Sequence, residues 1–129
     1  MSRNSWAADY YNSEEVLFKK GHWTFKQDKD KDRFLYFDDA CIDPMCDYDE
    51  FRLFDKGFIL YRKNEQQNAY ALFQEDIKTP LYKLKGKDVY VKKEENLISF
   101  VDGTNITTFD INSMSKVTLD DENQIKIDF

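Results

Sequence analysis

The chain has 129 residues, of which 41% are hydrophobic and 16% aromatic, and its formal net charge at pH 7 is −6. This size predicts one domain over residues 1–129, and the apolar content excludes a globally disordered chain. The acid excess disfavours a non-specific nucleic-acid binder, because such a protein needs a basic face to displace counterions from phosphate.

Three features of the sequence favour a cytoplasmic protein. No stretch approaches the ~18 consecutive apolar residues of a membrane span. The first residues, MSRNSWAADYYNSEE, lack the apolar core of a secretory signal. Cys41 and Cys46 are the two cysteines, and in a chain without a signal we expect them to be reduced thiols.

At the N-terminus, residues 1–12 follow no hydrophobic period, so we expect a loosely held arm. Over residues 13–21 acids come first and two lysines and a glycine come last, which suits the dipole of one short helix. A strand over Val16–Lys19 that turns at Gly21 is the alternative.

The next segment predicts a hairpin followed by a loop. Aromatic runs at Trp23–Phe25 and Phe34–Phe37 flank a charged tip, as in a pair of strands. We expect Asp38–Glu50 to be a loop, because Pro44 cannot donate to a ladder and aspartate favours turns.

The stretch Phe51–Phe73 is the centre of the predicted fold. Two runs rich in Phe, Tyr, Ile and Leu flank the polar tip Arg62–Asn68, which predicts a long hairpin. We expect this hairpin to lie in the middle of a sheet, with the flanking hairpins added at its edges.

Beyond Pro80, short apolar runs between turn residues predict further strands, and Asp102-Gly103 is a strong hairpin signal. These strands are expected at Leu81–Leu84, Val89–Lys92, Leu97–Val101, Asn105–Ile111, Lys116–Leu119 and Gln124–Ile127. The predicted fold is therefore mainly β: an antiparallel meander of roughly eight to ten short strands, in a twisted sheet, a sandwich or a barrel.

A short pattern recurs along the chain. Gly57 and Gly86 each follow a lysine and precede a tyrosine by four residues, and Gly21 precedes Phe25 in the same way. The pattern indicates either a duplicated hairpin or the recurrence of ordinary turn chemistry around glycine, and both alternatives stay open.

Strand alternation also selects the residues that we expect in the core, although a shift of one residue would exchange the two faces. The core candidates are Trp23, Phe25, Leu35, Phe37, Leu53, Phe58, Leu60, Tyr70, Leu72, Val89, Val91, Ile98, Phe100, Ile106, Phe109, Val117, Leu119, Ile125 and Ile127.

Catalytic and metal chemistry find little support in the sequence. His22 is the only histidine, so a nucleophilic triad would have to include it. Cys41, Cys46 and His22 leave a zinc ion short of four ligands. We therefore expect no enzyme, no metal and no cofactor.

Two charged segments resemble binding sites only in part. Asp28, Asp30 and Asp32 alternate as in a calcium loop, but Arg33 replaces the glycine that such a loop requires. A second segment combines lysines with Tyr82 and Tyr90, as in a single-stranded nucleic-acid platform, yet lysines equally protect edge strands from aggregation. We therefore do not expect nucleic acid as a partner.

The densest acidic cluster carries our leading functional hypothesis. Acidic loops often serve solubility alone, but carboxylates interleaved with aromatics also suit the capture of a basic protein. The hypothesis is a non-enzymatic inhibitor or immunity-type protein that occludes a basic partner such as a toxin or a nuclease. Its expected partner-binding residues are Asp38, Asp39, Asp43, Asp47, Asp49, Glu50, Tyr36, Tyr48 and Phe51.

Two alternatives come from other classes of function. A small-molecule-binding β domain or a weakly marked enzyme would hold its ligand in an aromatic-lined pocket with a few polar groups. A structural or assembly subunit would pair with other chains through exposed edge strands. The sequence leaves the oligomeric state open.

Overall fold

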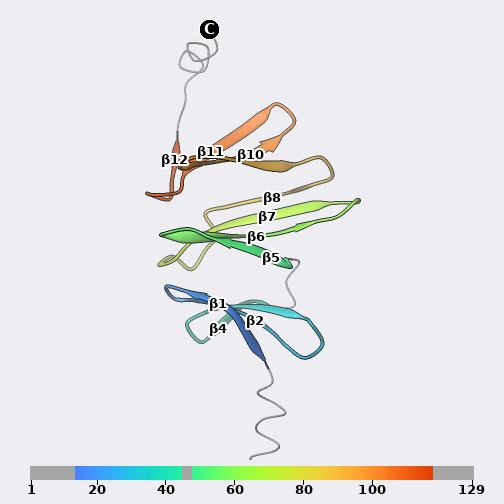
Figure 1. Cartoon of the computed structure of the whole chain (residues 1–129), viewed down its shortest axis with the longest axis vertical. Coiled ribbons are helices and arrows are strands. Elements are labelled where there is room, and N and C mark those ends of the chain that lie inside the picture. Colours follow the sequence, from blue (N-terminus) through green and yellow to red (C-terminus); the bar gives the residue numbers. More distant parts are fainter. Residues whose placement is uncertain (1–13, 45–47, 118–129) are drawn as a thin grey trace, which may run out of the picture.

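The computed structural model describes residues 14–44 and 48–117, which form three four-stranded antiparallel sheets in stacked layers (Figure 1). We call them sheets A, B and C in chain order. Each sheet is a meander, because strands that follow one another in the chain lie side by side. The prediction of a mainly β meander is confirmed. The described residues contain no helix of the length and apolarity that a membrane crossing requires.

Sheet A consists of β1 (Glu15–Lys20), β2 (Trp23–Gln27), β3 (Arg33–Phe37) and β4 (Ala40–Pro44). The predicted hairpin around the charged tip is confirmed as β2 and β3, which pair from Trp23 opposite Phe37 to Gln27 opposite Arg33.

The short helix expected near the N-terminus is wrong, because its described part is strand β1, which turns at Gly21 into β2. Gly21 adopts a φ of 58°, the left-handed conformation that a tight turn favours. Phe18 pairs across the sheet with Phe25, and both rings are buried. Cross-strand burial therefore outweighs the weak capping signals at the ends of this segment.

The loop expected over Asp38–Glu50 is wrong in its first part, where Ala40–Pro44 forms β4. Asp38 adopts a φ of 54° in the two-residue connection from β3, and aspartate tolerates this conformation better than most residues. Pro44 ends an edge strand, which tolerates a residue without a backbone N–H.

Sheet B consists of β5 (Glu50–Leu53), β6 (Gly57–Lys63), β7 (Asn68–Gln74) and β8 (Tyr82–Gly86). The predicted central hairpin is confirmed, since β6 and β7 pair along their whole length in the middle of the sheet. The prediction that neighbouring hairpins extend its edges is wrong. They form sheets A and C, which lie on its two faces (Figure 1).

Burial on both faces explains why the central strands are apolar at nearly every position. On β7, Ala69, Ala71 and Phe73 pack against sheet A, whereas Tyr70 and Leu72 pack toward sheet C. A strand with one wet face would alternate apolar and polar residues, but a strand between two layers carries a continuous apolar run.

Sheet C consists of β9 (Tyr90–Glu94), β10 (Leu97–Asp102), β11 (Asn105–Asp110) and β12 (Ser115–Val117). The hairpin predicted at Asp102-Gly103 is confirmed as the connection between β10 and β11, with Gly103 at a φ of 62°. The strand predicted at Gln124–Ile127 and the arm predicted at 1–12 lie outside the described residues.

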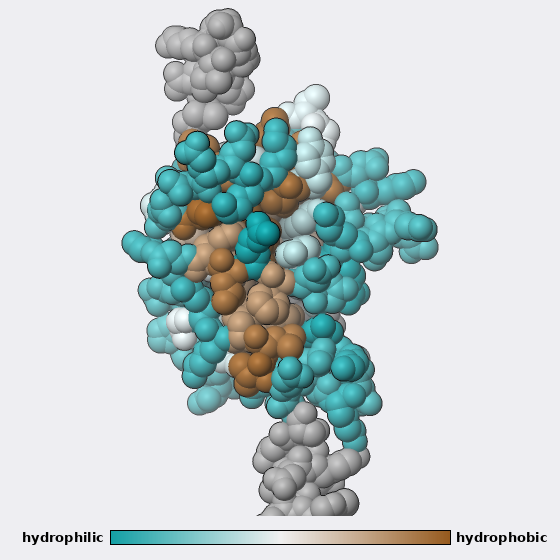
Figure 2. Space-filling view, in the orientation of Figure 1, coloured by the Kyte–Doolittle hydropathy of each residue, from teal (hydrophilic) through white to brown (hydrophobic). Residues whose placement is uncertain are grey.

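Two cores hold the layers together, one between sheets A and B and one between sheets B and C. Figure 2 shows hydrophobic residues in a band along the stack, with hydrophilic residues on both sides. Most core candidates are buried or lie at a core margin. Those outside the described residues are Leu119, Ile125 and Ile127.

Two core candidates are wrong, because Leu53 is 44% exposed and Ile106 is 62% exposed. Leu53 ends β5, an edge strand of sheet B. Phe109 is buried toward sheet B, so Ile106, an odd number of residues earlier on β11, points to the outer face of sheet C.

The recurring glycine pattern matches the architecture in two of its three positions. Gly21 lies in the connection between the first two strands of sheet A, and Gly57 begins the second strand of sheet B, whereas Gly86 ends the last strand of sheet B. The reasons for glycine also differ. Only Gly21 of these three has a positive φ, while a Cβ at Gly57 would overlap the carbonyl oxygen of Phe73 and the Met114 side chain.

Candidate functional site

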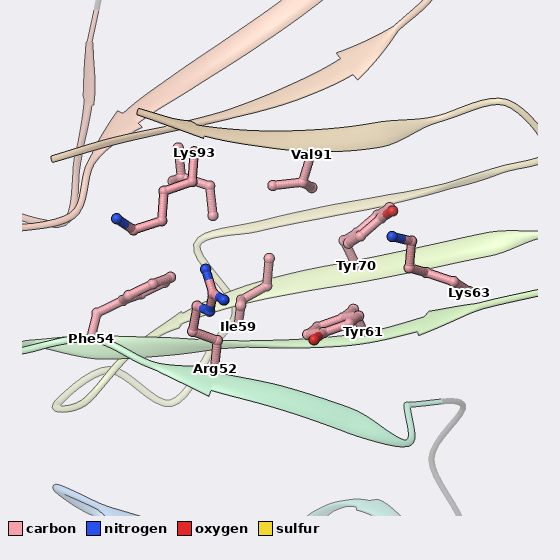
Figure 3. A pocket seen from close by; sticks show the side chains of 9 residues that line it. Arg52, Phe54, Ile59, Tyr61, Lys63, Tyr70, Val91 and Lys93 are labelled. Carbon is pink, nitrogen blue, oxygen red and sulfur yellow. The ribbon is translucent and has the colours of Figure 1, made fainter. Parts of the chain in front are cut away.

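A hollow of about 280 Å³ lies between sheets B and C (Figure 3). We call it the B–C pocket. It is lined by Arg52, Phe54, Ile59, Tyr61, Lys63, Tyr70, Val91, Lys93 and Ile98. These residues come from β5, β6, β7, β9 and β10 and from the residue after β5, so both sheets are needed to form it.

Strand alternation brings these side chains into one space. Ile59, Tyr61 and Lys63 are alternate residues of β6 and therefore share the face that looks toward sheet C. Val91 and Lys93 are alternate residues of β9 and share the face of sheet C that looks toward sheet B, on the opposite wall of the pocket. On both strands an apolar face ends in a cation.

The inner part of the pocket is apolar and aromatic. Ile59, Tyr70 and Ile98 are each at most 4% exposed. The rings of Tyr61 and Tyr70 stack with centroids 6.2 Å apart. Burial, and to a lesser degree the neighbouring Tyr61, raises the pKa of Tyr70, whose protonated hydroxyl can donate a hydrogen bond.

The outer part of the pocket is positively charged. Arg52, Lys63 and Lys93 are exposed, and Lys93 Nζ donates to the backbone oxygen of Glu95 at 2.9 Å. None of the ion pairs within the described part of the chain includes these three cations, and no lining residue is acidic. Three positive charges thus gather at this pocket in a chain of net charge −6.

The predicted acidic residues Asp38 and Asp39 are exposed in the connection from β3 to β4. Asp38 Oδ1 lies 2.8 Å from Nδ1 of His22, and Asp76, in the connection from β7 to β8, lies 3.9 Å from the other ring nitrogen. The hydrogen bond and charge of Asp38, with a smaller contribution from Asp76, raise the pKa of His22. The ring also stacks on Phe37, with centroids 5.1 Å apart.

The structure does not bring the predicted acidic residues together into one patch. Glu50 begins β5 at the opposite end of the stack from Asp38, because β3 and β4 run about 16 Å between the two ends. Asp49 lies at that end too, where its Oδ2 is 3.4 Å from Arg62 Nε. Asp47 and the side chain of Asp43 lie outside the described part.

The predicted aromatic anchors are largely inside the molecule. Tyr48 is 4% exposed and belongs to the core between sheets A and B. Phe51 packs against that core, with its ring centroid 4.8 Å from that of Phe18. Tyr36 is half-buried on sheet A, with Lys26 Nζ 4.8 Å from the centre of its ring. Tyr48 and Phe51 therefore pack in the core and stabilise the fold.

The alternating aspartates form the connection between β2 and β3. One oxygen each of Asp28, Asp30 and Asp32 lies within 4.8 Å of the others. Asp28 Oδ1 accepts hydrogen bonds from the backbone N–H groups of Asp30 and Asp32, both at 2.9 Å. This bonding explains the aspartates as turn residues, and we assign no metal to them.

Comparison of the chain with protein-family models, with curated proteins and with solved structures finds no significant match.

Sequence reasoning missed the B–C pocket, although a usable signal exists. Arg52 and Lys63 are not among the candidate residues. Lys93 belongs to the segment of lysines and tyrosines for which a nucleic-acid platform and the protection of an edge strand are the two interpretations. A cation that continues an otherwise apolar alternation, as in Ile59, Tyr61 and Lys63, indicates a face that is dry at one end and open at the other.

Proposed function

We propose that this chain is a non-enzymatic β domain that binds a small molecule in the B–C pocket. The observation that carries the proposal is the pairing of an apolar, aromatic floor with several converging polar groups, which is the usual composition of a ligand site. The volume of about 280 Å³ lies near the lower end for such sites, so the ligand is small.

The chemistry of the lining favours binding over catalysis. It includes no carboxylate, imidazole or thiol, which are the groups that most often act as general bases or nucleophiles. Burial raises the pKa of Tyr70 further above neutrality, so it suits hydrogen bonding to a ligand better than proton abstraction.

A titration of the full chain with small aromatic fragments, followed by amide NMR shifts, tests this function. We expect the largest shifts on the strands that line the B–C pocket. Val91→Phe fills part of the pocket and should abolish them. Ile106→Phe adds the same ring on the outer face of sheet C and should leave them unchanged. Shifts that Val91→Phe does not alter would overturn the proposal.

The occlusion of a basic protein is the second candidate function. It is favoured by the carboxylates of Asp38 and Asp76, which two different sheets place on either side of His22, with Asp39 beside them. An exposed acidic group of this kind would speed the encounter with a basic toxin or nuclease. The division of the other acids between the two ends of the stack makes this candidate the weaker one.

A charge reversal tests the second candidate. The variant Asp38→Lys, Asp39→Lys, Asp76→Lys should slow association with a retained basic partner about tenfold. The matched control reverses three exposed acids at the other end of the stack: Glu65→Lys, Asp88→Lys and Asp102→Lys. Equal association rates for the two variants would exclude this surface as the docking site.

A further inference from the structure

We propose that the ligand of the B–C pocket is a small organic anion with a flat apolar body, whose carboxylate or phosphate group binds between Arg52 and Lys93. This inference rests on the proposed function and adds the charge and shape of the ligand to it.

The cations of the pocket are placed to hold an acid group from two sides. Arg52 stands on β5 of sheet B, and Lys93 stands on β9 of sheet C, on the opposite wall (Figure 3). Phe54 lies on the same side of the pocket as these two residues. A guanidinium binds a carboxylate or a phosphate through two parallel hydrogen bonds, and an ammonium group adds a mobile point charge.

The absence of a counter-charge within the described chain strengthens this assignment. Arg62 has Asp49 as an ion-pair partner, and Lys20 has Glu75. Arg52, Lys63 and Lys93 face the pocket without such a partner among the described residues. An anionic ligand would supply the missing charge.

Protection of edge strands does not account for this arrangement. Lys92 and Lys93 are neighbours on the edge strand β9, and a single outward lysine is enough to discourage pairing with another chain. Lys92 pairs with Ser99 on the outer face of sheet C, whereas Lys93 pairs with the buried Ile98 and lines the pocket. Edge protection also gives no reason for Arg52 to face Lys93 across the hollow.

The remaining walls define the body of the ligand. Ile59, Val91 and Ile98 are aliphatic, and Phe54 and Tyr70 add ring faces or edges. Inorganic phosphate would leave these surfaces without contacts. A cavity of roughly 150 Å³ accommodates benzene, so the larger B–C pocket suits a body of one or two rings with its acid group.

Four probes separate the charge of the ligand from its shape: phenyl phosphate, benzoate, phenol and benzamide. Each is titrated into the full-length chain and followed by amide NMR shifts. Phenyl phosphate and benzoate should shift the strands that line the pocket and should bind at least about tenfold more tightly than phenol and benzamide. Inorganic phosphate alone should bind more weakly than phenyl phosphate.

Two neighbouring lysines provide a matched pair of variants. Lys93→Gln should weaken phenyl phosphate binding about fivefold, whereas Lys92→Gln removes an equal charge one residue away and should leave the affinity unchanged. Arg52→Gln combined with Lys93→Gln should weaken binding more than tenfold. Arg52, Lys92 and Lys93 are exposed, so we expect the variants to fold and to give dispersed NMR spectra like those of the wild type.

The outcomes distinguish this inference from the proposed function. If phenol and benzamide bind in the pocket as tightly as the anions, the anionic class is wrong while the binding function stands. If phenyl phosphate binds equally well to wild type and to the Arg52→Gln, Lys93→Gln variant, the site of the acid group is wrong. If no probe shifts the strands around the pocket, both proposals fail.

Discussion

The two interfaces of sheet B differ in what fills them. Between sheets A and B, rings from both sheets pack against one another: the ring of Trp23 lies 4.9 Å from that of Phe73, and Phe18 lies 4.8 Å from Phe58. Between sheets B and C, the core also contains rings, such as Tyr82 at 4.9 Å from Phe100, but it is bordered by hollows.

The hollows lie on the face of sheet B where the proposed function places the ligand. A second hollow of about 210 Å³ also borders sheets B and C, where Glu75, Asp76 and Ile77 lie near Ser113 and Met114. The ring contacts between sheets A and B stabilise the fold. The interface between B and C leaves space that a ligand can occupy. In the proposed function, one face of sheet B supports the fold and the other face also takes part in binding.

The largest effects are expected from fully buried leucines on the two faces of sheet B. Leu60 faces sheet A, Leu72 faces sheet C, and neither is exposed to solvent. Leu60→Ala and Leu72→Ala should each lower the free energy of unfolding by about 2–5 kcal/mol in urea denaturation. Leu53→Ala, at a half-exposed position, should cost less than about 1 kcal/mol.

Two results for the unfolding free energies of these leucine variants would contradict the described positions of the sheets. A small cost for Leu72→Ala beside a large cost for Leu60→Ala would mean that sheet C does not cover sheet B. Similar costs for Leu53→Ala and Leu60→Ala would contradict the position of β5 at the edge.

A smaller effect is expected at the turn that holds sheet A against sheet B. Gly21 and Gly103 both have a positive φ, but a Cβ at Gly21 would lie 2.6 Å from the Glu75 backbone oxygen, whereas Gly103 has open space. Gly21→Ala should therefore cost about 2–4 kcal/mol and Gly103→Ala about 1 kcal/mol. Equal losses of unfolding free energy for the two variants, in thermal or urea unfolding, would contradict the close contact between Gly21 and Glu75.

The pKa of His22 tests the contacts at the same turn. Because Asp38 and Asp76 raise its folded-state pKa above 6.5, charged His22 stabilises the turn below pH 6.5, while Asp38 is ionised. This contribution is lost as the pH rises through the folded-state pKa. His22 is the only histidine, so its ring resonances in an NMR titration are unambiguous.

A carboxylate-to-amide change provides the control for that titration. Asp38→Asn should bring the pKa of His22 back toward 6.5, since it removes the largest cause of the shift. A pKa at or below 6.5 in the wild-type protein would mean that the connections from β1 to β2 and from β3 to β4 do not meet as described.

The smallest effect on stability is expected at the mouth of the B–C pocket. Arg52→Gln and Lys93→Gln remove exposed charges that have no ion-pair partner within the described chain, so unfolding should change by less than about 0.5 kcal/mol. A loss of several kcal/mol in urea denaturation would show that these cations support the fold, which would contradict their role in binding.

The sequence predicted the hairpins well because their signals are local. The apolar runs around the Arg62–Asn68 tip and the Asp102-Gly103 turn need only neighbouring residues to specify a strand pair. It predicted β1 and β4 poorly, because their strand state depends on partners across the sheet. Phe18 becomes a strand residue through burial against Phe25, which no local capping signal reveals.

The layer arrangement and the pocket were beyond local signals. Alternation tells which residues share a face, but not which sheet covers that face, so edge addition and stacking were indistinguishable. Arg52 and Lys93 are 41 positions apart in the sequence and meet only because sheet C lies on sheet B. The described acidic residues lie apart for the converse reason, since Asp38 and Glu50 are close in sequence yet β4 carries the chain from one end of the stack to the other.

The most direct measurement of the central claim is a set of intermolecular NOEs between the ring protons of phenyl phosphate and the methyl groups of the labelled protein. The account predicts NOEs to Ile59, Val91 and Ile98, which line the space between sheets B and C. NOEs confined to other methyl groups, such as those of Val16 or Ile106, would place the ligand elsewhere and contradict the assignment of binding to this interface.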